Sequence, residues 1–112
     1  MKLLAHYTIF GDSIYHLHTF DCNENISHTK VSVETPNTAF IHRLLIVTSD
    51  DSQDTITNLS YIINSHIHNS ITKAAKEAAK YISEKGIGYS IEKPYFLLIS
   101  EYPDYLVSKI NK

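Results

Sequence analysis

The sequence predicts a single α+β domain over residues 1–112, with an antiparallel-rich sheet of about four to five strands and helices on one face. Before Ser49, β-branched and aromatic residues recur in short runs, which is typical of strands. After Ser49, apolar residues recur at three- and four-residue steps, which is typical of a helix. A last apolar run, Tyr95 to Ser100, indicates a further strand. A chain of 112 residues has the usual size of one domain.

The first two strands are expected to form a hairpin. Leu3 to Phe10 and Ser13 to Phe20 are rich in β-branched and aromatic residues, and Gly11-Asp12 lies between them. Glycine at the first central position suits a two-residue type II′ turn. This turn places Tyr7 opposite His16. One face of the hairpin is then shared by Leu3, Ala5, Tyr7, Ile9, Ile14, His16, His18 and Phe20.

Two more strands are expected before the helical region. His28 to Glu34 alternates between apolar and polar residues, which predicts a half-exposed strand. A turn at Thr35-Pro36-Asn37-Thr38 precedes the run from Ala39 to Thr48. This run contains Leu44-Leu45-Ile46-Val47, a continuous apolar stretch that favours a central strand buried on both faces.

The helical stripe runs from Ser52 to Lys85, and Gly86 is a natural residue to end it. One helix of this length would measure about 50 Å, which is longer than a small domain. The segment Asn64 to Ser70 contains poor helix formers, and Asn69 or Ser70 could cap a second helix. We therefore expect either a break there or one long helix that projects and pairs with a second copy.

Two further expectations concern the edges of the helical region and the C-terminus. Thr55 to Ile63 has a composition that also suits a strand, as an alternative to the first half of the helix. Tyr89 to Glu92 is expected to form a short strand. Pro103 suits the first turn of a short C-terminal helix from Asp104 to Ile110.

The charge and cysteine content exclude several classes of protein. The net charge of −2 argues against a dedicated binder of duplex nucleic acid. Residues 1–55 carry −4 and residues 56–112 carry +2, a mild dipole that could orient a partner. Cys22 is the single cysteine, so no intramolecular disulfide can form, and we expect a cytoplasmic protein. No stretch reaches the roughly 20 apolar residues of a membrane span.

Seven histidines are the unusual feature of the composition. His16 and His18 are two residues apart in an expected strand and would share a face, where imidazoles can bind zinc or act as general acid or base. The hairpin register decides whether His6 joins them. The Gly11-Asp12 turn favours the register that places His6 on the opposite face, so we expect no metal site and no cofactor. Each buried histidine should then be hydrogen-bonded to a neighbour.

Further candidate binding residues lie outside the hairpin. Arg43 is the single arginine, and its planar group suits a carboxylate or phosphate. Tyrosines near the C-terminus are a residue type favoured at interfaces. The candidate binding residues are His42, Arg43, His66, His68, Tyr95 and Tyr102.

These features favour a small non-catalytic binding domain that self-associates as a dimer or larger assembly. A protein partner or a small anionic ligand is a further expectation. The size and the Lys-, Asn- and Ile-rich composition are similar to those of inhibitors and ligand-sequestering proteins of mobile elements. The alternative is a small histidine-based, possibly metal-dependent, phosphodiesterase or nuclease that uses His16 and His18. The sequence contains no phosphate-binding glycine loop and no zinc-protease motif.

Overall fold

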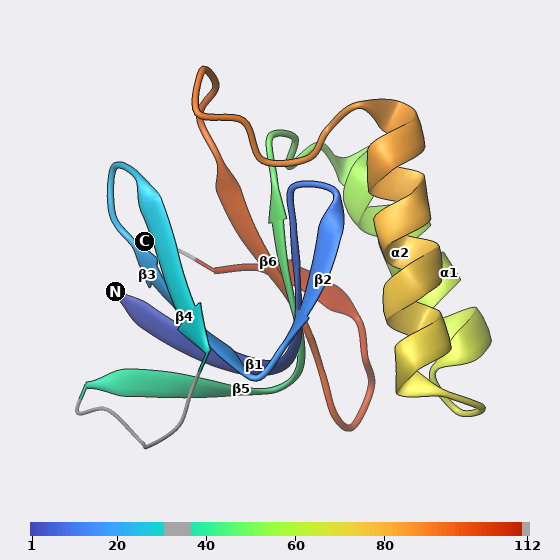
Figure 1. Cartoon of the computed structure of the whole chain (residues 1–112). Coiled ribbons are helices and arrows are strands. Elements are labelled where there is room, and N and C mark those ends of the chain that lie inside the picture. The colour runs from blue at the N-terminus through green and yellow to red at the C-terminus, as the bar shows by residue number, and fades with distance from the viewer. Residues whose placement is uncertain (31–36, 111–112) are drawn as a thin grey trace.

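The computed structural model describes residues 1–30 and 37–110, which form a mixed sheet of seven strands with two helices on one side of it (Figure 1). The strands are β1 (Lys2–Phe10), β2 (Ser13–His16), β3 (His18–Cys22), β4 (Ile26–Lys30), β5 (Thr38–Thr48), β6 (Phe96–Glu101) and β7 (Val107–Lys109). The helices are α1 (Gln53–His66) and α2 (Ile71–Lys85). The α+β class is therefore confirmed, whereas the expected four to five strands are too few.

The strand order is β4-β3-β1-β5-β6-β7, and β2 also pairs with β1. The pair β1·β5 is parallel, and every other named pair is antiparallel. The chain leaves β1 through β2, β3 and β4 on one side, and β5 then lies on the other side of β1. Two long strands that are distant in sequence thus run in the same direction at the centre of the sheet.

The predicted hairpin and its register are confirmed. Gly11 has a φ of 62°, Phe10 lies opposite Ser13, and Tyr7 lies opposite His16. A glycine at the first turn position has no Cβ, so the positive φ costs little. The expected strand Ser13 to Phe20 is nevertheless divided into β2 and β3.

The division lies at Leu17, which has a φ of 55° and whose N–H donates to the carbonyl of His6. On β1, Leu3 and Ala5 belong to one hydrophobic cluster, whereas Ile9 belongs to the other. The two ends of the hairpin therefore bury opposite faces. The expectation that Leu3 and Ala5 share a single face with Tyr7 and Ile9 is wrong, because the alternation reverses at the level of the left-handed residue Leu17.

A matching irregularity occurs on β5. The parallel register passes from Ala5 opposite Ile41 to Tyr7 opposite Leu44, so β5 has one extra residue at this level. Arg43, within this bulge, has a φ of 129°. Bulges bend a strand and re-aim its side chains. The sheet consequently curls, and in Figure 1 the first parts of β1 and β5 sweep away from the helices.

Two hydrophobic clusters cover the two faces of this curled sheet. The cluster beneath the helices contains Leu44, Ile46, Leu59, Ile63 and Ile82, with the buried alanines of α2. The second cluster has these members: Leu3, Ala5, Phe20, Cys22, Ile41, Leu45, Val47, Tyr95 and Leu97. Neighbouring residues of β5 alternate between the two clusters, so the expected central strand is confirmed as buried on both faces.

The helical region breaks where the poor helix formers lie. The Ser52 hydroxyl accepts the N–H of Thr55 at the start of α1, and the Ser70 hydroxyl accepts the N–H of Lys73 at the start of α2. Gly86 ends α2 with a φ of 65°. The alternative of a strand over Thr55 to Ile63 is wrong. Because α1 and α2 pack side by side (Figure 1), the structure has no single long helix to project toward a second copy.

The C-terminal expectations need correction. Residues 89–92 form no strand, and only Gly88 makes an isolated bridge, to Thr48. The expected helix from Asp104 to Ile110 is a turn followed by β7. Val107 pairs with Ser100 of β6 and donates its N–H to the Ser60 hydroxyl. Pairing along the edge of β6 thus overrides the local helix signal of Pro103.

Two further points concern the expected strand His28 to Glu34 and the helices. The strand is present as β4 up to Lys30, and its remainder lies outside the described residues. Neither α1 nor α2 is long and apolar enough to cross a membrane.

Candidate functional site

A chain of rings crosses one surface of the molecule, and we name it the aromatic row. Its members in order of contact are Phe40, His42, Tyr102, Tyr105 and His68. Successive ring centroids lie 6.4, 6.1, 6.2 and 6.3 Å apart, within the range of paired rings. The His6 ring lies beside the row, 5.3 Å from Phe40 and 5.4 Å from His42.

Three separate parts of the chain supply the aromatic row. Phe40 and His42 lie on β5 on either side of Ile41, which is buried, so the two rings share the outer face. Tyr102 and Tyr105 come from the turn between β6 and β7, and His68 comes from the link between α1 and α2. The bulge of β5 therefore brings strand residues next to two loops.

The rings of the row differ in their exposure to solvent. Phe40 is 53% exposed and Tyr102 is 63% exposed, whereas Tyr105 is only 7% exposed. The Tyr105 hydroxyl accepts a hydrogen bond of 3.1 Å from Nε of Arg43. This contact holds the guanidinium of Arg43 beside the row. The exposed ring of Tyr102 therefore packs against a buried tyrosine that Arg43 holds in place.

A carboxylate and an unsatisfied imidazole border the row. The backbone N–H of His42 donates to Oε1 of Glu101 at 3.1 Å. Nδ1 of His6 is buried and lacks a hydrogen-bond partner within the described part of the chain. Burial lowers the pKa of His6, and the charges of Arg43, His42 and His16 lower it further. His6 as a whole is half-buried, like His18 and His28, so the expectation for fully buried histidines stays a prediction.

The structure brings four of the six predicted binding residues together. His42, His68 and Tyr102 are members of the aromatic row, and Arg43 contacts it through Tyr105. Tyr95 lies elsewhere: it is buried in the second cluster, and its hydroxyl donates to the carbonyl of Asn23. Burial, followed by the proximity of Cys22, Tyr89 and Asp21, raises the pKa of Tyr95.

His66 also lies outside the row. It ends α1, and its carbonyl accepts the N–H groups of Asn69 and Ser70. Sequence reasoning missed Phe40, considered His6 only as a partner of His16 and His18, and included Tyr105 only among the C-terminal tyrosines. The i, i+2 spacing of Phe40 and His42 was a usable signal for a shared strand face, whereas the contacts of His6 and Tyr105 depend on the fold.

His16 and His18 diverge, contrary to the expectation that they share a face. The His16 ring lies 5.0 Å from the ring of Tyr7, which packs against the cluster beneath the helices. The His18 ring lies 5.0 Å from that of Tyr15, which packs against the second cluster. Leu17 stands between the two histidines with its left-handed backbone, and this is the physical reason.

The neighbour of His18 is His28, which sequence reasoning did not single out. Their Nδ1 atoms lie 3.2 Å apart, across the antiparallel strands β3 and β4. The His28 ring stacks on Phe20 at 4.9 Å and lies 4.5 Å from Tyr15. Burial lowers the pKa of His18, and the charges of His28 and Lys30 lower it further.

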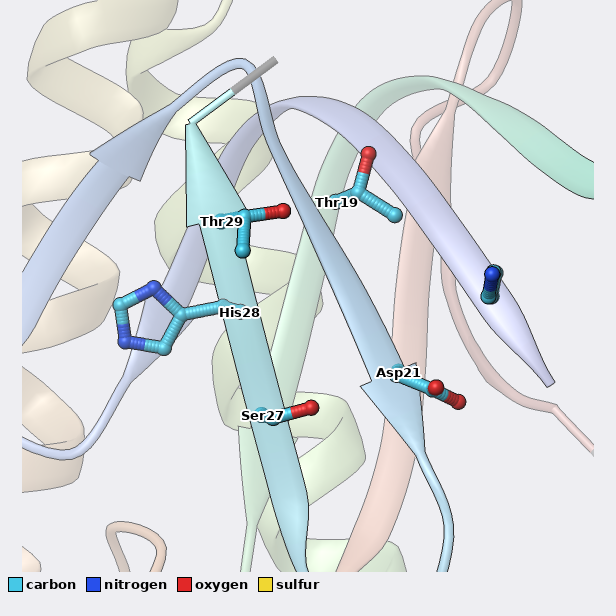
Figure 2. Close-up of a pocket in the computed structure, with 6 residues that line it drawn as sticks. Thr19, Asp21, Ser27, His28 and Thr29 are labelled. Carbon is cyan, nitrogen blue, oxygen red and sulfur yellow. The ribbon is translucent and has the colours of Figure 1, made fainter. Parts of the chain in front are cut away.

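A hollow of about 220 Å³ lies on the other face of the same two strands. Figure 2 shows that the hydroxyls of Ser27 and Thr29 point into this side with Asp21, while the His28 ring points away. Thr19, Lys2 and His28 itself complete the lining. The hollow offers hydroxyls, one carboxylate and one ammonium group, which suits a small polar ligand.

Residues 1–30 and 37–110 contain no group of three or more histidine, cysteine, aspartate or glutamate side chains that could hold a metal ion. Comparison of the chain with protein-family models, curated proteins and solved structures found no match. The functional interpretation therefore depends on the chemistry of the surfaces described above.

Proposed function

We propose that this protein is a small non-catalytic binding domain that self-associates through the aromatic row. One observation carries the proposal: Phe40 and Tyr102 are large rings that are 53% and 63% exposed, and the His42 ring joins them into one surface. Aromatic residues and arginine are enriched at protein interfaces. Burial of these rings against a partner would remove a costly contact between water and apolar surface.

The chemistry of the surface favours a second copy as the partner. A two-fold interface requires one patch that complements itself. The aromatic row has donors in Arg43 and His42, and an acceptor in the Glu101 carboxylate beside them. Two copies related by a two-fold axis would each supply rings, a cation and an anion to the other. No single sign of charge dominates the patch and repels its own copy.

The contacts of the row support binding rather than catalysis. The His42 ring contacts Phe40, His6 and Tyr102, and Arg43 is held by a tyrosine hydroxyl. General acid–base chemistry requires a histidine positioned on a group that reacts. Rings that contact other rings instead provide apolar surface that a partner can bury. An inhibitor or ligand-sequestering role in the cytoplasm, with a protein or a small anion beside Arg43, belongs to the same proposal.

Light scattering on two double variants tests the proposal. Phe40→Ala with Tyr102→Ala removes the exposed rings, and Tyr61→Ala with Ile91→Ala removes two large side chains elsewhere that are even more exposed, at 75% each. We expect wild type and the Tyr61/Ile91 variant to be dimers or larger. The Phe40/Tyr102 variant should dissociate at least about tenfold more readily, since truncating a central interface ring costs about 2 kcal/mol or more.

Two results would overturn the proposal. One is a wild-type protein that stays monomeric at the highest concentration that can be reached. The other is an assembly that weakens equally in both double variants, because the surface of assembly would then not be the aromatic row.

A further inference from the structure

The histidine pair His18 and His28 lies apart from the aromatic row and has a geometry of its own. The two Nδ1 atoms face each other at 3.2 Å. The residues are diagonal neighbours on paired strands, because His18 lies opposite Lys30 and His28 lies opposite Phe20. Hydrogen bonds between β3 and β4 therefore set the separation of the two backbones.

Surrounding rings fix the orientation of both imidazoles. Phe20 stacks on His28 with an interplanar angle of 22°, and Phe10 lies 5.6 Å from the same ring. Tyr15 contacts both imidazoles, at 5.0 Å from His18 and 4.5 Å from His28. A ligand pair that is held in place before a metal arrives loses little entropy on binding.

The separation of the two nitrogens matches one coordination geometry. Zinc–imidazole bonds of about 2.0–2.1 Å at a tetrahedral angle place two ligand nitrogens roughly 3.3 Å apart. Neighbouring positions of a square-planar or octahedral ion with similar bonds would place them roughly 2.9 Å apart. The observed 3.2 Å is the length of a hydrogen bond between the two rings, and zinc would take the place of the shared proton with little movement of either nitrogen.

We infer that Nδ1 of His18 and Nδ1 of His28 form a two-ligand zinc site, with the other two tetrahedral positions open to water or to an outside ligand. Both histidines are half-buried, so solvent reaches them. β4 is the edge strand in the described sheet order. Open positions on zinc are filled by water, carboxylate or imidazole groups.

Isothermal titration of the full-length chain with zinc chloride tests the inference. We expect one zinc ion per chain for the wild type. His18→Gln and His28→Gln should each weaken zinc binding by about tenfold or more, because the second imidazole acts at a high effective concentration. His16→Gln is the matched control: it lies in the same hairpin, is exposed, and its ring contacts Tyr7 instead. Its affinity for zinc should equal that of the wild type.

A second measurement covers the case in which a glutamine variant does not fold. Nitrogen-15 spectra of the wild-type imidazoles should shift at Nδ1 of His18 and His28 when zinc is added. The inference is overturned if the wild type binds no zinc, or if the shifts occur at other histidines. It is also overturned if both glutamine variants fold and bind zinc as the wild type does. A stoichiometry of one zinc ion per two chains would also overturn the inference, because a second chain would then fill the two zinc positions that we assign to water or an outside ligand.

Discussion

His6 concentrates two opposing requirements in one side chain. Its ring supports Phe40 and His42 in the aromatic row, which favours an aromatic group there. Its Nδ1 is nevertheless buried and unpartnered within the described residues, which disfavours a polar group. The neighbouring Arg43, His42 and His16 further oppose a positive charge on it. Its pKa therefore lies below the ordinary histidine value of 6.5.

This lowered pKa predicts that the stability of the fold falls as the pH falls below 6.5. In that range the unfolded chain binds a proton at His6 more readily than the folded chain does, so protons favour unfolding. The loss is absent above 6.5 and complete below the lowered folded pKa. Urea denaturation at a series of pH values should show a shallower loss in His6→Phe. The lowered pKa of His18 leaves a residual slope in that variant. An unchanged slope would contradict this explanation.

Arg43 and Tyr102 were expected to bind because their side chains suit recognition. The fold places both at the aromatic row, and their role in binding stays a prediction. His28 was missed as a partner of His18, because their contact requires the pairing of β3 with β4. Such long-range pairing leaves no trace in residue spacing.

At the scale of elements, Leu17 divides an otherwise continuous strand. A leucine with a φ of 55° adopts a left-handed conformation that costs free energy in any residue with a Cβ and that suits glycine. No sequence signal marks this position. The hairpin turn, the caps at Ser52 and Ser70 and the end at Gly86 were all predictable, because each has a residue type with a local reason. The division of the strand at Leu17 was not predictable from the sequence.

Leu17→Gly should therefore stabilise the protein, by about 0.5–1 kcal/mol, because glycine removes the left-handed strain but adds some entropy to the unfolded chain. Leu17 is 37% exposed, so little packing is lost. Leu106→Gly is the control, since Leu106 is also exposed and its φ is not positive. It should lower the free energy of unfolding by a similar amount. Chemical denaturation measures both, and destabilisation of equal size in the two variants would contradict the role of Leu17.

At the scale of the whole molecule, the parallel pairing of β1 and β5 organises everything else. It places the bulge at Arg43 and the left-handed residue Leu17 on opposite sides of β1, both at the level of His6, and the two together curl the sheet. The outer face of β5 then meets the turn after β6, where His42 contacts Tyr102. The α+β class was predictable from the change of period near Ser49. The parallel pair was not, because adjacent segments suggest hairpins and give no signal for a strand that returns to the far side of β1.

The proposed self-association requires that copies of the chain meet at the aromatic row. Isotope-filtered nuclear Overhauser spectra of an equal mixture of labelled and unlabelled chains test it most directly. We expect contacts between copies that involve the rings of Phe40 and Tyr102, and no such contacts that involve Tyr61 of α1. Contacts between copies that arise from α1 or α2 while the aromatic row stays silent would contradict it.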